Sequence, residues 1–209
     1  MNTGALLPKN RLEAFSDGVL AIVITILVLE LKVPEGGGDL LSSLAGDWRY
    51  FLGYLISFVY VGGFWVSHSN ATRLIDRADP LLFRLTLLWL LFVSVIPFTT
   101  AVMTDFLGSP GSETAVAIYG IDLFLASLML TLVIRYSARR EGLAADDVAD
   151  GELQAAVRQR GKVLAIQGVS VLLALFFPEL AVGLYLFTAL LFLAAPLLIA
   201  RRARRPGGA

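Results

Sequence analysis

The sequence predicts an all-α membrane protein with six transmembrane helices. Of its 209 residues, 57% are hydrophobic, and the mean hydropathy is +0.76, both high for a soluble domain. In a bilayer only helices or closed barrels satisfy the backbone, so continuous apolar runs of about 20 residues predict helices. A single domain over residues 1–209 is expected, with spans at about 12–33, 48–69, 81–104, 114–136, 160–177 and 180–200.

The first segment starts with a polar cluster and continues as an apolar helix that ends before Pro34. At about 1.5 Å per residue, this helix is long enough to cross a hydrocarbon core of about 30 Å. Thr25 is its only polar side chain between Gly18 and Leu29. Charged groups at a membrane boundary are costly unless they are paired, so the cluster needs partners elsewhere in the fold. Its members are Arg11, Glu13, Ser16 and Asp17.

The second segment carries the only histidine of the chain near its cytoplasmic end. Trp65 and His68 are three residues apart and therefore share a helix face. His68 is expected at the same membrane depth as Arg11 and Asp17. One buried network of Arg11, Asp17 and His68 would satisfy all three side chains, so we predict that network.

The later segments contain prolines within or at the start of helices, one acidic residue inside a span and one long polar connection. Pro80 opens the third helix, a favoured position for proline, and Pro97 and Pro196 are expected to kink their helices. Asp122, in the outer half of the fourth helix, pairs with a backbone or hydroxyl donor or faces a water-filled crevice. Residues 137–159 are predicted to form a solvated cytosolic loop with an amphipathic turn near Leu153–Val157.

Positive charges define the orientation. Fifteen of the 17 Lys and Arg residues lie on one side of the predicted spans, and only Lys32 and Arg49 lie on the other. The positive-inside rule then places both termini in the cytoplasm of a multi-pass protein of the cell membrane. The basic run Arg201–Arg205 is interpreted as the anchor of the last helix, with a lipid- or nucleic-acid-binding patch as the alternative.

The sequence indicates neither an enzyme nor a metalloprotein. It lacks G-x-S-x-G, H-E-x-x-H and a phosphate-binding glycine loop, and no pair of catalytic acids lies within the spans. There is no cysteine, and one histidine is too few for a transition-metal site. No cofactor and no nucleic-acid partner are expected.

One face of the first helix carries a stripe of mostly apolar residues. At about 100° per residue the stripe is well separated from Ser16 and Asp17. Taken alone, such a stripe is most simply a core or lipid contact. It consists of Phe15, Gly18, Ile22, Thr25, Ile26 and Leu29.

Motifs in the first three segments resemble those of the transmembrane protein 175 potassium channel family. The signature Arg-x-x-x-Phe-Ser-Asp occurs at residues 11–17 and continues through Ala21-Ile22-x-x-Thr25 and Leu-Lys-Val-Pro34. Trp65-x-x-His68 and Pro97-Phe98 extend the resemblance into the second and third helices. The last three helices resemble the family only in number and length.

The resemblance implies a homotetramer of six-helix subunits in the lipid bilayer, with the first helices lining a central pore for potassium ions. By this resemblance Ile22 forms the narrowest ring, Ile26 and Leu29 form further apolar rings, and Thr25 supplies hydroxyls for selectivity, with K⁺ passing transiently near Ile22 and Thr25. The structural polar network would comprise Arg11, Phe15, Ser16, Asp17, Trp65 and His68.

A small proton- or cation-coupled secondary transporter is the alternative function. Asp17, His68 and Asp122 would then act as relay groups. Transporters usually show repeats or interrupted helices, and the chain has no second Phe-Ser-Asp motif and no matched pair of broken spans. The sequence therefore favours the potassium channel.

Overall fold

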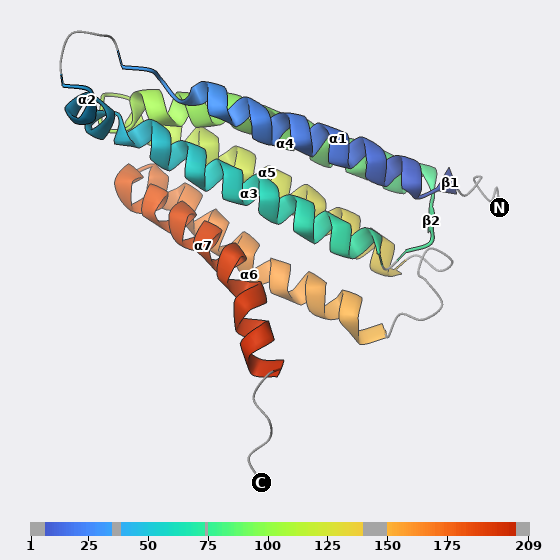
Figure 1. Ribbon diagram of the computed structural model, residues 1–209. Helices are drawn as coiled ribbons and strands as arrows, with labels where there is room; N and C mark the ends of the chain where they lie inside the picture. Colours follow the sequence, from blue (N-terminus) through green and yellow to red (C-terminus); the bar gives the residue numbers. More distant parts are fainter. Residues whose placement is uncertain (1–6, 35–38, 74, 140–149, 204–209) are drawn as a thin grey trace.

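Long helices form at all six predicted segments. The computed structural model describes residues 7–34, 39–73, 75–139 and 150–203 (Figure 1). In chain order the elements are β1 (Leu7–Pro8), α1 (Asn10–Ile26), the 3₁₀ helix η1 (Leu27–Glu30), α2 (Leu40–Gly46), α3 (Trp48–Thr72), β2 (Arg77–Ala78), α4 (Pro80–Phe106), α5 (Ser112–Arg139), α6 (Asp150–Ala174) and α7 (Pro178–Ala203).

The all-α prediction is confirmed. Within the described ranges, four helical stretches are long and apolar enough to cross a membrane: α1 with η1, α3, α4 and α5. The described side chains of α7 add a shorter apolar helix, Pro178–Phe192. Large apolar side chains also cover much of the outer surface, as expected where the surroundings are lipid or another subunit.

One local expectation was wrong, and one short helix was not predicted. The cytosolic loop predicted over residues 137–159 is shorter, because α5 continues to Arg139 and α6 begins at Asp150. The turn expected near Leu153–Val157 is therefore part of a continuous helix, whose side chains there lie outside the described residues. The seven-residue helix α2 was not predicted; it begins where the Ser42 N–H donates to the Asp39 carboxylate over 3.0 Å.

Local chemistry sets the ends of α4. The Asp79 carboxylate accepts the Leu82 N–H over 2.8 Å, and Pro80 occupies the first turn, where its missing N–H costs nothing. Pro97 lies within the helix, as predicted. The turn into α5 uses Gly108 and Gly111 at φ +78° and +95°, a region that side chains strongly disfavour.

The helices pack so that α1 lies at one edge of the bundle. Figure 1 shows α1 beside α4, with α6 and α7 on the opposite side of α3 and α5, which agrees with the contacts between elements. Large buried aromatic side chains fill the interior, among them Tyr60, Phe64, Trp89, Tyr119 and Tyr185. Helix α1, which carries the polar cluster and the apolar stripe, is thus peripheral in the subunit.

A short antiparallel ladder ties the chain start to the α3–α4 connection. Leu7 pairs with Ala78, and Pro8 pairs with Arg77. Lys9 adds a bond from its ammonium to the Thr72 carbonyl, 3.1 Å. The N-terminal segment and the α3–α4 connection therefore lie at the same end of the bundle, and α2 lies at the other end (Figure 1).

Candidate functional site

Helix α1 has one buried face and one exposed face. Leu12, Leu20, Val23 and Leu27 pack into the core with Ser16, at spacings of three and four residues. The other side carries the stripe identified in the sequence: Phe15 is 53%, Ile22 60% and Leu29 76% exposed, and Gly18, Thr25 and Ile26 are also exposed. The subunit thus leaves an apolar surface on this helix uncovered.

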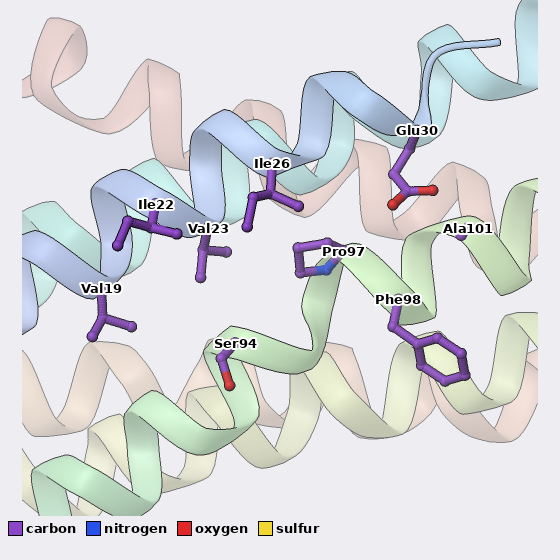
Figure 2. A pocket seen from close by; sticks show the side chains of 9 residues that line it. All are labelled: Val19, Ile22, Val23, Ile26, Glu30, Ser94, Pro97, Phe98 and Ala101. Carbon is purple, nitrogen blue, oxygen red and sulfur yellow. The ribbon is translucent and has the colours of Figure 1, made fainter.

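A groove runs between this helix and α4. Figure 2 shows Val23 and Ile26 directed from α1 towards the α4 segment at Pro97, and Glu30 at one end. The groove encloses about 520 Å³ and is mostly apolar. Its lining consists of Val19, Ile22, Val23, Ile26, Glu30, Ser94, Pro97, Phe98 and Ala101.

The Thr25 hydroxyl is held by its own helix. It donates to the carbonyl oxygens of Ile22, at 2.8 Å, and Ala21, at 3.0 Å. A hydroxyl has one hydrogen, which these two carbonyls share, so the lone pairs of the oxygen remain available on the exposed side. Thr25 is therefore suited to accept hydrogen bonds or to coordinate a cation at this face.

The polar cluster is arranged differently from the sequence prediction. Asp17 accepts the indole N–H of Trp65 over 3.0 Å, and both side chains are exposed in the subunit. His68 is buried and stacks on Trp89, with ring centroids 4.7 Å apart and planes at 19°. Arg11 is exposed. In the single subunit these side chains do not form one buried hydrogen-bonded network: Trp65, and not His68, donates to Asp17, although Asp17 lies near enough to His68 to interact with it electrostatically.

Two polar atoms of this region are buried without a hydrogen-bond partner among the described residues. They are the Ser16 hydroxyl and Nε2 of His68, whose residues are 0% and 1% exposed. The aromatic stacking on Trp89 fixes the plane of the His68 ring, and no sequence signal pointed to Trp89.

The far end of α1 is fastened by an ionic cluster that the sequence did not predict. The Lys32 ammonium bonds the Asp105 carboxylate at the end of α4 and the Tyr50 hydroxyl of α3, the latter at 3.0 Å. Hydrogen bonding to Asp105, with a smaller contribution from Tyr50, raises the pKa of Lys32 from 10.5 to about 12. Its stabilising effect is complete below pH 10.5 and is lost as the pH rises towards 12. Both charged side chains are about half exposed, so solvent screens the pair.

Asp122 is buried far from the other predicted relay groups. The Thr99 hydroxyl donates to its carboxylate over 2.8 Å, which answers the sequence question in favour of a hydroxyl donor. His68 lies against Trp89, and Trp89 and Thr99 are ten residues, or about 15 Å, apart along α4. The structure therefore does not bring Asp122 together with Asp17 and His68.

Several apolar helices and a peripheral helix with an uncovered apolar face define a multi-pass helical membrane protein. Comparisons identify its family. The family model described as "Endosomal/lysosomal potassium channel TMEM175" matches residues 11–97, which include the Phe-Ser-Asp signature, α3 and the first part of α4. A potassium channel of Chryseobacterium sp. (strain P1-3) is 35% identical over 191 residues, 88% of this chain and 92% of that protein.

Structural similarity agrees with the sequence matches. The crystal structure of a lysosomal potassium-selective channel TMEM175 homolog from Chamaesiphon minutus superimposes with a TM-score of 0.80 at 30% identity, covering 90% of this chain and 97% of that chain. The bovine endosomal/lysosomal proton channel TMEM175 is 34% identical over 147 residues, which are 65% of this chain and 31% of that protein. The chain belongs to the TMEM175 family.

Proposed function

We propose that this protein is a potassium-selective cation channel, assembled as a homotetramer in which α1 of each subunit lines a central pore. The observation that carries the proposal is the exposed stripe of α1. The stripe is apolar except for Thr25, whose hydroxyl bonds the backbone of its own helix. Two relatives that the chain matches over most of their length are named potassium channels, which supports K⁺ as the permeant ion. The chemistry required is passive conduction, with no catalytic step and no cofactor.

The exposed face of α1 favours a closed ring of subunits. One helix cannot enclose an ion pathway, so a pore built from it requires several copies around an axis. Arg11 and Asp17 are also exposed in the single subunit, and charged side chains are costly against lipid hydrocarbon. Contact with neighbouring subunits and with pore water removes that cost.

The proposed selectivity arises from partial dehydration. Four Ile22 side chains form the narrowest ring, and Ile26 and Leu29 form further apolar rings that resist wetting. An ion must shed part of its water to pass, and K⁺ holds its water less tightly than Na⁺. The Thr25 oxygens, whose hydrogens bond the helix backbone, return part of the lost coordination.

The proposed topology has six spans, α1 with η1, α3, α4, α5, α6 and α7, with both termini in the cytoplasm. The β1–β2 ladder supports it, because it places the N-terminal segment and the α3–α4 connection at one end of the bundle. Lys9, Arg73 and Arg77 lie at that end, whereas Lys32 lies with Asp105 at the other end.

Flux and mass measurements test the proposal together. The purified protein is expected to be a tetramer by native mass spectrometry in detergent or nanodiscs. In liposomes it should carry K⁺ down its electrochemical gradient without a coupled ion. Counterflow and saturation would instead indicate the transporter, and a monomer that conducts would exclude the shared pore.

Thr25 variants test the role of the hydroxyl. Thr25→Val keeps the shape of the side chain and removes the oxygen, so we expect the K⁺/Na⁺ permeability ratio to fall by about tenfold, equivalent to about 1.4 kcal/mol. Thr25→Ser keeps the oxygen and should retain most of the preference. Reversal potentials under bi-ionic conditions measure both. Loss of the preference in Thr25→Ser together with its retention in Thr25→Val would mean that the methyl group, and not the oxygen, matters.

Asp17 variants test the structural role of the polar cluster. Asp17→Ala leaves the Trp65 N–H without its acceptor, and loss of a hydrogen bond to a charged group costs about 1.5–3 kcal/mol. We expect the tetramer fraction to fall about tenfold or more, with little change in selectivity of the channels that do form. Asp17→Asn keeps an acceptor oxygen and is the matched control. Normal assembly with altered ion preference would place Asp17 in the pore.

A further inference from the structure

The interface between α5 and α6 lies on the side of the subunit away from α1 and contains its own buried polar groups. Helix α1 packs on α3 and α4, whereas α6 packs on α5 and α7. We call the facing residues Ser127 and Thr131 of α5 and Arg160 and Gln167 of α6 the polar seam. All four are at most 9% exposed.

Two contacts establish the register of these antiparallel helices. Near the start of α5, a Cβ on Gly120 would lie 3.0 Å from Cγ2 of Val171, near the end of α6. Further along α5, the Thr131 hydroxyl accepts a hydrogen bond from Nε of Arg160 over 3.1 Å. Eleven residues separate the two positions on each helix, so the register is unbroken between them.

The register brings Ser127 and Gln167 into the same part of the seam. Ser127 lies seven residues after Gly120 and four before Thr131, on the face that meets α6. Gln167 lies seven residues after Arg160 and four before Val171, on the face that meets α5. Thr131 lies opposite Arg160, and the helices are antiparallel, so Ser127, four residues before Thr131, lies opposite residue 164. Gln167 is three residues further along α6, a rise of only about 4.5 Å.

Both side chains are fully buried and lack partners. Ser127 is 1% and Gln167 0% exposed, and the Ser127 hydroxyl and both amide atoms of Gln167 have no hydrogen-bond partner among the described residues. The Tyr60 hydroxyl bonds Thr188 and also has a weak, hydrogen-bond-like interaction with the Gln167 side chain, but neither amide atom of Gln167 makes a hydrogen bond of full geometry. Buried polar groups nearly always have a partner, so these three atoms require one.

We propose that each subunit binds ordered water in the polar seam, bonded to the Ser127 hydroxyl and the Gln167 amide. The partner must both donate and accept, because Gln167 presents an unpaired N–H₂ donor beside an unpaired carbonyl acceptor. Water does both, and two to four polar partners are what a buried water requires. A halide ion accepts only, so it would leave the Gln167 oxygen unpaired.

The direct test is a high-resolution structure of the assembled protein. A density peak is expected within about 3 Å of both the Ser127 hydroxyl and the Gln167 amide in every subunit. The peak should disappear in the Ser127→Ala/Gln167→Leu double variant. A resolved seam without such a peak, or a direct bond from Gln167 to Tyr60 or Ser127, would overturn the proposal. So would an anomalous signal at the site after exchange of chloride for bromide.

A double-mutant cycle tests the bridge in solution. If one water links the two groups, either single variant already breaks the bridge, so the Tm shift of the Ser127→Ala/Gln167→Leu double variant should be smaller than the sum of the single shifts. The matched control is Ser137→Ala, which removes a buried α5 hydroxyl that bonds its own helix at the Val133 carbonyl, 3.0 Å. Its shift should add to that of Gln167→Leu. Additive shifts for Ser127 and Gln167 would contradict a shared water.

Discussion

Replacing Ile22 with asparagine is expected to abolish most of the preference for K⁺ over Na⁺ and to raise the conductance severalfold. In the proposed pore, four Ile22 side chains make the narrowest ring, and their apolar surface forces ions to shed water. An amide wets that ring, so a hydrated ion passes at lower cost. Each 1.4 kcal/mol removed from the barrier speeds passage about tenfold. Single-channel conductance and bi-ionic reversal potentials measure the two effects.

The control for this variant must be chosen from the structure. Val23, the neighbour about 100° round the helix, looked suitable from the sequence, but it is only 4% exposed, and Val23→Asn would bury an amide in the core. Val28 is 48% exposed and does not belong to the stripe. Val28→Asn should leave ion preference nearly unchanged. Equal effects at positions 22 and 28, or none at 22, would mean that the stripe does not line the pathway.

Helical periodicity explains why the exposed stripe was predictable. Phe15 and Ile22 are seven residues apart within α1, and a regular α-helix places such residues on one face. Leu29, seven residues further on in η1, is exposed as well. The family suggested by the motifs of the first three segments is confirmed by the comparisons. Local sequence thus determined the position and rotation of α1.

Contacts between distant segments were the part that sequence could not supply. Lys32 meets Asp105 across 73 residues, and no motif suggested this pair. The resemblance placed Asp17 and Trp65 in one network, but not the hydrogen bond that joins them across 48 residues. Equal membrane depth suggested His68 for Asp17, but depth leaves the direction of a side chain open, and His68 points to Trp89. Predicting such pairs requires the rotation of both helices.

The largest effect on folding is expected from a single methyl group at Gly120. In Gly120→Ala the new Cβ would overlap Oη of Tyr185 and would lie 2.8 Å from its Cζ and 3.0 Å from Cγ2 of Val171. The Tyr185 ring is fully buried and packs edge-on against Tyr119, with centroids 5.6 Å apart, so it has little room to withdraw. Overpacking of this kind costs about 1–3 kcal/mol, which outweighs the gain of up to about 1 kcal/mol from replacing glycine in a helix.

Two further variants separate this clash from a general effect of the substitution. Gly62 also lies within a long helix, and a Cβ there would meet nothing within 4 Å, so Gly62→Ala should be neutral or slightly stabilising. Adding Tyr185→Phe to Gly120→Ala removes the nearest atom and should recover part of the lost Tm. Thermal unfolding of the purified variants, followed by intrinsic fluorescence or size-exclusion chromatography, provides the comparison. If Gly120→Ala proved as stable as Gly62→Ala, α5 and α7 would not approach as closely as described, because a methyl group cannot share that space with the Tyr185 hydroxyl.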